Sequence, residues 1–374
     1  MRAIFLVFCV FRGQVDENAV NRKDIAERVG NIAQIAGAQK YTIQDGNGNG
    51  VGVVSVRTGS GLGFDVLSGR GMDIGQCFYK DIPIAWMSPA GITSPAYYEE
   101  MEDRWLRSFS GGLLTTCGMT YCGASCTDVD WQNNMEKLGV HGRVSNYTAE
   151  DVAVEQEWVS GEYNISIRGK VRQAALYKEN FVLTRRISTA LGGNTITISD
   201  SIENLGFTQQ PLMVLYHINF GYPIVSENSR LVAAIKETIA RPGQDEAARE
   251  MNLFAEFTAP QEGYAERCYY HALKGDGDGS TYAMLVNDEL NLGIYVKYNI
   301  KQLFNLVEWK QMQTGIYAVG IEPANCYLEG RNKSREGKTL QFIQPGEIKK
   351  FDIEIGILDG KQEIQRMEEI IKSL

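Results

Sequence analysis

The chain has 374 residues, of which 44% are hydrophobic and 22% are charged, a composition typical of a globular protein with a substantial core. A net charge of −9 and a pI of about 5.1 argue against binding to nucleic acid or to an anionic membrane. Seven cysteines, an odd and low number for this length, argue against a secreted disulfide scaffold and favour reduced thiols.

The chain begins with a short apolar run, residues 3–11, between Arg2 and Arg12. The run is too short to span a bilayer, and no small-residue cleavage site follows it. A signal segment, an added strand and a misassigned start remain alternatives. We therefore treat residues 1–20 as an N-terminal extension of uncertain status and residues 21–374 as one domain. A short helix is predicted at 17–29, and we expect the protein to be cytoplasmic.

Alternation of apolar and polar residues recurs along most of the chain and predicts half-buried strands. Ile196 and Ile198 alternate with threonine and serine, while Ile353, Ile355 and Ile357 alternate with acidic residues and glycine. The predicted strands are 41–44, 51–56, 152–159, 163–169, 181–189, 195–199, 211–217 and 351–357. Turn signals separate them at Asp45-Gly46, Gly192-Gly193, Asp276-Gly277 and Pro345-Gly346.

Helical periodicity is clearest at the C-terminus, where residues 362–374 carry one apolar stripe that includes Ile364, Met367 and Ile371. Many strands and few helices predict an all-β fold, a sandwich or closed barrel. No internal repeat, low-complexity tract or proline-rich linker divides the chain.

Two glycine-rich segments imitate ligand-binding loops. Residues 45–50 match the first half of a calcium-binding EF-hand loop, but its twelfth position is Val56 instead of glutamate. A hairpin turn is therefore the better interpretation. Gly59, Gly61 and Gly63 open no helix, which argues against a phosphate-binding loop.

Three cysteines cluster at Cys117, Cys122 and Cys126, but their spacing contains no CxxC pair, which argues against structural zinc. Cys117 lies in a stretch of small residues, 111–118, whose backbone could lie close to a ligand.

The chain contains three histidines. His141 lies between glycines, which suggests a backbone held close to another group. His217 ends an apolar strand and precedes Asn219, so it is well placed to face a polar pocket. His271 follows two tyrosines with no polar motif and is interpreted as a surface or strand residue. Taken singly, His141 and His217 could equally be hydrogen-bonded structural residues.

One carboxylate is distinctive. Glu322 lies in an otherwise apolar predicted strand, where a charge must be paired or functional because burying it alone is costly. Desolvation would raise its pKa towards the range of a general base. The alternative is a glutamate bonded to backbone amides.

In combination, these segments resemble the aldose 1-epimerase (galactose mutarotase-like) superfamily, specifically a less characterised bacterial branch. The resemblance extends from about residue 29 to residue 358. It is carried by SGRGMDI (68–74), WMSP (86–89), FSGGLL (109–114), TCG (116–118), VHGR (140–143), YHINFG (216–221), EWK (308–310), GIEP (320–323) and PGE (345–347).

The resemblance implies a large antiparallel β-supersandwich and sugar chemistry. It implies that Glu322 takes the proton from the anomeric hydroxyl, that His217 protonates the ring oxygen and that His141 holds substrate oxygens. No metal or other cofactor is implied. The expected partner is a small-molecule sugar, with no nucleic acid or membrane, and the chain is expected to be a monomer or homodimer.

The sequence departs from better-known mutarotases because the Asn-Arg motif that supplies their substrate-binding arginine is not evident. Arg70 or Arg143 could replace it. Further candidates for substrate binding are Asp73, Cys117, Asn219, Trp309 and Lys310. Trp309 could stack on a sugar ring or fill the core.

Three other interpretations remain open. The fold could carry a sugar-binding or sensing module without chemistry. His141, His217 and Glu322 could form a hydrolytic His₂Glu metal site, although their wide dispersal along the chain is unlike HExxH spacing. The third is an epimerase or isomerase of an unusual acidic or phosphorylated sugar, bound by Arg70, Arg143 or Lys310.

Overall fold

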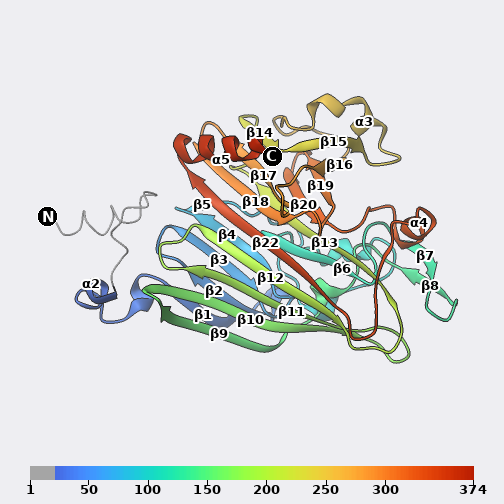
Figure 1. Cartoon of the computed structure of the whole chain (residues 1–374), viewed down its shortest axis with the longest axis horizontal. Coiled ribbons are helices and arrows are strands. Elements are labelled where there is room, and N and C mark those ends of the chain that lie inside the picture. The colour runs from blue at the N-terminus through green and yellow to red at the C-terminus, as the bar shows by residue number, and fades with distance from the viewer. Residues whose placement is uncertain (1–21) are drawn as a thin grey trace.

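Two large antiparallel β-sheets pack face to face in the computed structural model of the chain, which describes residues 22–374 (Figure 1). The strands of the larger sheet are β1 (Gly37–Thr42), β2 (Gly52–Arg57), β3 (Leu62–Leu67), β4 (Asp73–Tyr79), β5 (Ile82–Pro83), β6 (Leu114–Met119), β13 (Gln210–Gly221), β15 (Ile235–Ala240), β16 (Arg267–Leu273), β19 (Asn305–Gln311), β20 (Ala318–Ala324) and β21 (Gln341–Ile343). This 12-stranded sheet has the order β1-β2-β3-β4-β6-β13-β20-β19-β16-β15, with β5 beside β4 and β21 beside β13.

The second sheet has eight strands. They are β9 (Glu150–Val159), β10 (Glu162–Ala174), β11 (Asn180–Ala190), β12 (Thr195–Asn204), β14 (Ser229–Ala233), β17 (Ser280–Asn287), β18 (Leu292–Asn299) and β22 (Ile348–Asp359). Their order is β14-β17-β18-β22-β12-β11-β10-β9. A separate hairpin joins β7 (Cys126–Val129) to β8 (Met135–Leu138).

The helices are short and peripheral. They are α2 (Arg22–Ala26), α3 (Asp245–Arg249), α4 (Arg331–Glu336) and α5 (Lys361–Ser373), with 3₁₀ turns η1 (Ile32–Gln34), η2 (Gly46–Gly48), η3 (Pro95–Tyr97), η4 (Arg104–Arg107), η5 (Val144–Asn146) and η6 (Met251–Leu253). The amphipathic α5 packs on the outside of the second sheet, where Ile364 and Ile371 are buried (Figure 1). Across residues 22–374, no helix combines the length and apolarity that crossing a membrane requires.

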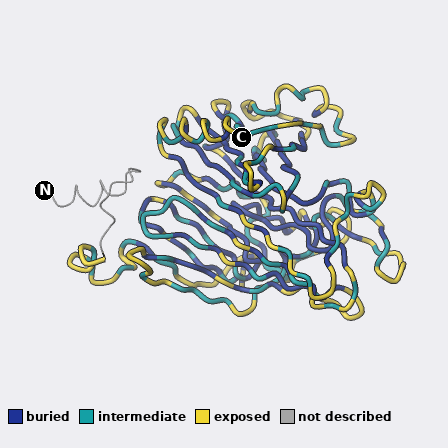
Figure 2. Tube along the Cα trace, in the orientation of Figure 1, coloured by how far each residue is buried: buried dark blue, intermediate teal, exposed yellow. Residues whose placement is uncertain are grey.

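The main core lies between the two sheets and is made by alternating side chains. Ile167, Ile187, Ile198 and Ile353 are cross-strand neighbours on four successive strands, and all four are buried. Such pairs are the unit of sheet stabilisation. Figure 2 shows burial concentrated in the central strands of both sheets, with exposure in the connecting loops.

The predicted all-β sandwich is confirmed. Each predicted strand overlaps an observed one, although β10, β12 and β13 extend well beyond the predicted ranges and β1 begins earlier. The segment 45–50 is a hairpin connection between β1 and β2, as predicted. The C-terminal helix is confirmed as α5. Of the helix predicted at 17–29, only α2 is observed within the described residues, and the predictions for residues 1–21 lie outside them.

Candidate active site

The larger sheet has two differently lined faces. Along β13, Tyr216 and Ile218 point into the core between the sheets, whereas Met213 and Leu215 belong to a second apolar cluster on the opposite side. Successive side chains of a strand point to opposite faces, so His217 lies on the same side as Leu215. We call this side, away from the second sheet, the outer face.

Two predicted catalytic residues meet on the outer face. β13 and β20 are antiparallel neighbours, and their register brings Nδ1 of His217 to 3.1 Å from Oε1 of Glu322. The exposed fractions of the two side chains are 7% and 1%. Neither atom has a hydrogen bond of acceptable geometry within the described residues. The two groups are therefore close enough for proton exchange, but the imidazole N–H is not aimed at the carboxylate.

A glycine makes room for the carboxylate. Gly320 lies two residues before Glu322 and thus on the same face of β20. A Cβ atom at this position would lie 2.1 Å from Oε1 of Glu322. The observed position of the carboxylate therefore requires glycine at 320.

Burial keeps both groups of the pair neutral. It raises the pKa of Glu322 well above its ordinary value, and nearby Glu266 raises it further. It lowers the pKa of His217 to about 3, and the neighbouring His141 adds to this shift. The free pair therefore shares one proton over a wide pH range.

His141 joins the pair from a tight loop after β8. Its φ is +59°, and the following Gly142 is so close to the backbone of residues 118–121 that a Cβ there would lie 2.5 Å from the Gly118 carbonyl oxygen. The predicted close backbone is confirmed. The ring centroid of His141 lies 5.9 Å from that of His217, and its Nδ1 lies 3.6 Å from Sγ of Cys122. Burial, together with the charge of Arg241, lowers its pKa to about 3.

Aromatic rings surround the histidines. Phe109 and Trp309 lie 5.0 Å and 5.5 Å from the ring of His217, and Trp105 lies 4.9 Å from that of His141. Trp86 contacts both Phe109 and Trp309. Trp309 thus lies beside the pair. Neither Trp105 nor Phe109 was predicted as a site residue, although Phe109 begins the FSGGLL segment (109–114).

Two further predicted residues lie close to the pair. Cys117 is buried on the outer face, and burial together with the nearby Glu322 raises the pKa of its thiol. Asn219 donates hydrogen bonds to the carbonyls of Gly112 (3.0 Å) and His217 (2.9 Å). The amide group of Asn219 therefore holds the backbone around His217.

Arg70 and Asp73 are built into the framework. Asp73 accepts hydrogen bonds from the amide and hydroxyl of Thr116 and pairs with Arg185 at 3.1 Å. Because Thr116 points away from Cys117, this carboxylate lies between the sheets, on the face opposite His217. Arg70 donates to carbonyls of Thr93 and Ser108 and to the side chain of Asn146. We do not retain either as a substrate-binding residue.

Lys310 and His271 also lie on the inner face. Lys310 follows Trp309 on β19, so its side chain points the opposite way, and it donates to the carbonyls of Leu253 and Glu256. His271 is a strand residue, as predicted, but the surface alternative is wrong because it is fully buried between Thr238 and Glu308.

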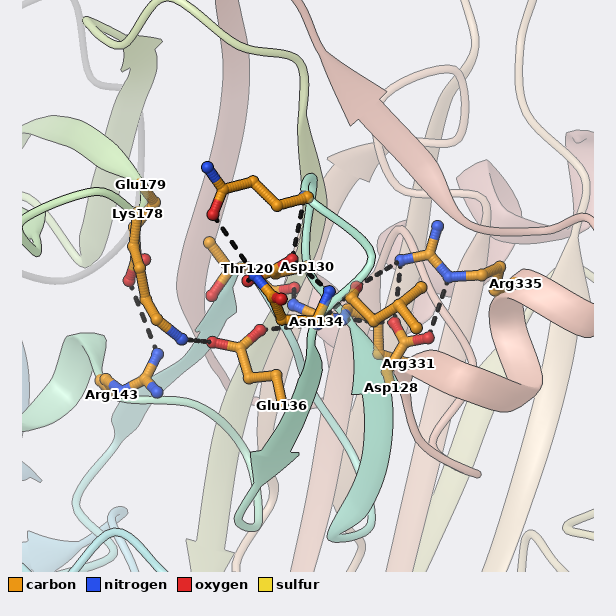
Figure 3. A network of polar contacts seen from close by, with 12 residues as sticks. Thr120, Asp128, Asp130, Asn134, Glu136, Arg143, Lys178, Glu179, Arg331 and Arg335 are labelled. Atoms are coloured by element: carbon orange, nitrogen blue, oxygen red, sulfur yellow. Dashed lines mark hydrogen bonds and ion pairs between the residues drawn. The ribbon is translucent and has the colours of Figure 1, made fainter.

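Arg143 belongs to a separate ion-pair network (Figure 3). It pairs with Glu100 and with Glu179, 3.5 Å away, and stacks over Tyr121. The network continues along a cavity of about 430 Å³ beside β7, β8 and α4. The ion pairs of this region are Lys178–Glu136, Arg331–Asp128, Arg331–Glu136 and Arg335–Asp128. Arg143 is thus engaged away from His217 and Glu322.

Sequence reasoning missed a charged cluster at the edge of the outer face. Arg241 follows β15, and its guanidinium lies 3.9 Å from Glu266 and 3.7 Å from Glu329. Glu266 in turn accepts a hydrogen bond from Nε1 of Trp309 at 3.0 Å. In the sequence, Arg241 precedes Pro-Gly and resembles an ordinary turn residue.

Metal ligation was an open alternative for the three site residues. Within residues 22–374, no group of three or more His, Cys, Asp or Glu side chains is arranged to hold a metal ion.

The comparisons with known proteins agree with this architecture. The model of a family described as a domain of unknown function, DUF4432, matches residues 48–357. No curated protein matches the chain.

Solved structures share the fold. A Klebsiella pneumoniae protein provisionally described as an aldose 1-epimerase has a TM-score of 0.83 and 23% identity over 90% of this chain and 87% of that one. A galactose mutarotase-like protein from Clostridium acetobutylicum has a TM-score of 0.58 and 15% identity, covering 87% and 99%. Galactose 1-epimerase from Lactobacillus acidophilus has a TM-score of 0.57 and 13% identity, covering 87% and 100%. The predicted galactose mutarotase-like fold is confirmed.

Proposed function

The chain belongs to the DUF4432 family, and from this premise and the site on its outer face we propose that it is an aldose 1-epimerase-like isomerase that interconverts the anomers of a sugar. The observation that carries the proposal is the contact of 3.1 Å between His217 and Glu322 on adjacent strands. One proton shared by two such groups supplies an acid and a base at the same time.

The reaction needs no net change in protonation of the pair. With the shared proton on His217 and Glu322 ionised, Glu322 takes the proton of the anomeric hydroxyl as His217 donates its proton to the ring oxygen, and the bond between C1 and the ring oxygen breaks. The open-chain sugar then rotates about C1–C2. Ring closure on the other face of the aldehyde reverses both proton transfers and regenerates the starting pair.

The neighbouring rings orient the sugar. Trp309 offers its face to the apolar side of a sugar ring, and His141 offers a nitrogen to a hydroxyl or to the ring oxygen. Because Glu322 is 1% exposed and the rings of Phe109 and Trp309 lie against that of His217, the proposal requires these rings to move when the sugar binds. Sugar binding should therefore change the tryptophan fluorescence.

The test is anomer exchange by NMR saturation transfer over a panel of reducing sugars, with wild type and Glu322→Gln. We expect wild type to accelerate exchange and the variant to lose about 10²–10⁴-fold in kcat/KM. Glu308→Gln is the matched control, since it makes the same change in a second histidine–glutamate pair on the inner face. Its folded fraction should retain the wild-type rate.

Two outcomes would contradict the proposal. An unchanged rate in Glu322→Gln would remove Glu322 from the chemistry. Sugar binding without acceleration by wild type would favour the alternative of a sugar-binding module.

A further inference from the structure

Arg241 is the cation beside the proposed catalytic groups. Its charge lowers the pKa of both His141 and Glu322. The contacts agree with this position, because Arg241 neighbours Glu266 and Glu266 is bonded to Trp309. Arg70 and Arg143, the arginines expected from the sequence, are engaged elsewhere.

The guanidinium of Arg241 has donors to spare. Among the described residues its side chain makes one hydrogen bond, from Nη2 to the carbonyl of Leu328 at 3.1 Å. The contacts to Glu266 and Glu329, at 3.9 Å and 3.7 Å, are longer than hydrogen bonds. The side chain is 22% exposed. An arginine with free N–H groups in a partly exposed position can donate to substrate oxygens.

The local charge balance selects the class of ligand. One guanidinium faces two carboxylates, those of Glu266 and Glu329, so a phosphate or carboxylate on a sugar would meet excess negative charge. Uncharged hydroxyl groups fit better, because Arg241 can donate to one oxygen while Glu266 accepts from the next.

We propose that Arg241 and Glu266 form a subsite that binds adjacent hydroxyl groups of a neutral sugar and discriminates against acidic or phosphorylated sugars. The subsite holds the far side of the sugar while its anomeric end lies over Glu322 and His217. The inference rests on the proposed function for the orientation of the sugar, but binding of a sugar to Arg241 and Glu266 can be measured without turnover.

The experiment uses methyl glycosides, whose blocked anomeric oxygen prevents ring opening. Tryptophan fluorescence reports their binding, because Trp86, Trp105 and Trp309 lie in the aromatic cluster. The ligands are methyl glucoside, methyl galactoside and methyl arabinoside, with methyl glucuronide as the anionic counterpart. The variants are Arg241→Gln and Glu266→Gln.

Arg267→Gln is the matched control. Arg267 lies on β16 and is paired with Glu250 at 3.1 Å, on the face opposite the site. This change should leave glycoside binding as in wild type.

We expect wild type to bind a neutral glycoside more tightly than methyl glucuronide. Arg241→Gln should weaken neutral binding by about 10- to 100-fold, the effect of losing a hydrogen bond from a charged group. Glu266→Gln should narrow the preference for neutral over anionic ligand. In turnover, Arg241→Gln should raise KM more than it lowers kcat. It should also move the alkaline limb of the pH profile upwards, since loss of the cation raises the pKa of Glu322.

The two proposals fail in different ways. Methyl glucuronide bound as tightly as the neutral glycosides, no binding of any neutral glycoside by wild type, or unchanged affinity in both variants would overturn the subsite. Neutral-glycoside binding that depends on Arg241, without acceleration of any reducing sugar, would support the subsite and overturn the proposed isomerase activity.

Discussion

The larger sheet carries a buried histidine–glutamate pair on each face. On the inner face, Nε2 of His271 lies 2.9 Å from Oε2 of Glu308, and its Nδ1 lies 2.8 Å from the hydroxyl of Thr238. On the outer face, His217 and Glu322 lie 3.1 Å apart without hydrogen-bond geometry. The separations are similar, but the inner imidazole has a hydrogen-bond partner at both nitrogens, whereas Nδ1 of His217 has none among the described residues. Each pair leaves one carboxylate oxygen unbonded, Oε1 of Glu308 and Oε1 of Glu322.

The difference distinguishes a pair that is built into the fold from the pair that we propose to be catalytic. Both side chains of the inner pair are fully buried, and the ring of Phe254 lies 5.0 Å from that of His271. Around the outer pair lie a second histidine, His141, the ring of Trp309 and the partly exposed charged groups of Arg241 and Glu266. Proximity of an acid and a base therefore does not by itself indicate a catalytic site; the outer pair differs from the inner one in the unbonded Nδ1 of its imidazole and in the groups around it.

The largest effect on stability should come from breaking the inner pair. Glu308→Ala leaves His271 without its carboxylate in a fully buried position. Removing one member of a buried pair typically costs about 3–5 kcal/mol of the free energy of unfolding. Urea unfolding followed by fluorescence measures this cost.

Glu322→Ala is the control for that measurement. Its carboxyl is kept neutral by burial and, unlike Glu308, makes no hydrogen bond with its histidine, so we expect a smaller loss of stability together with loss of activity. Equal destabilisation by the two substitutions would show that both pairs serve the fold.

A smaller effect, confined to rate, should follow from Gly320→Ala. The added methyl group would lie 2.1 Å from Oε1 of Glu322 and must displace the carboxylate. A displacement of about 1 Å can cost about 10²-fold in rate. We therefore expect that loss in kcat/KM for anomer exchange.

Gly356→Ala is a control with an equally close contact in the second sheet. A Cβ at 356 would lie 2.2 Å from the ring of Tyr295. It should reduce stability and leave the rate per folded molecule unchanged. A similar rate loss in both variants would mean that Gly320→Ala acts through general destabilisation.

The sequence indicated the residues of the outer pair better than their surroundings. Glu322 was recognisable because a carboxylate interrupts an apolar strand, and the alternating pattern predicted strands that the structure places in the second sheet. By contrast, β13 is buried along its whole length, so its pattern could not give its extent. A motif also does not show which face of a strand lies in the interior. Trp309 and Lys310 were therefore both predicted to bind substrate, although their side chains point to opposite faces of β19.

Arg241 could not be predicted for a related reason. Its role depends on long-range contacts with Glu266 and Glu329 from other segments of the chain. Arg70 and Arg143 lay inside recognisable motifs and were therefore favoured. The contacts then assigned Arg70 to loop carbonyls and Arg143 to a separate ion-pair network.

The smallest expected effect is the pH dependence of anomer exchange. Burial lowers the pKa of His217 from 6.5 to about 3 and raises that of Glu322. The active pair carries one proton, so the rate should fall when the pair gains a second proton, near the lowered pKa, and when it loses its last one, above the raised pKa. Between these limits the pair keeps one proton, and kcat/KM should be nearly the same at about pH 5 and about pH 7.

A histidine with an ordinary pKa would instead give the pair a second proton below about pH 6.5, and the rate at pH 5 would fall by about tenfold or more. Saturation transfer at the two pH values, with unfolding monitored in the same buffers, distinguishes these profiles. A tenfold fall in kcat/KM at pH 5, in fully folded protein, would mean that the pKa of His217 is close to that of a surface histidine.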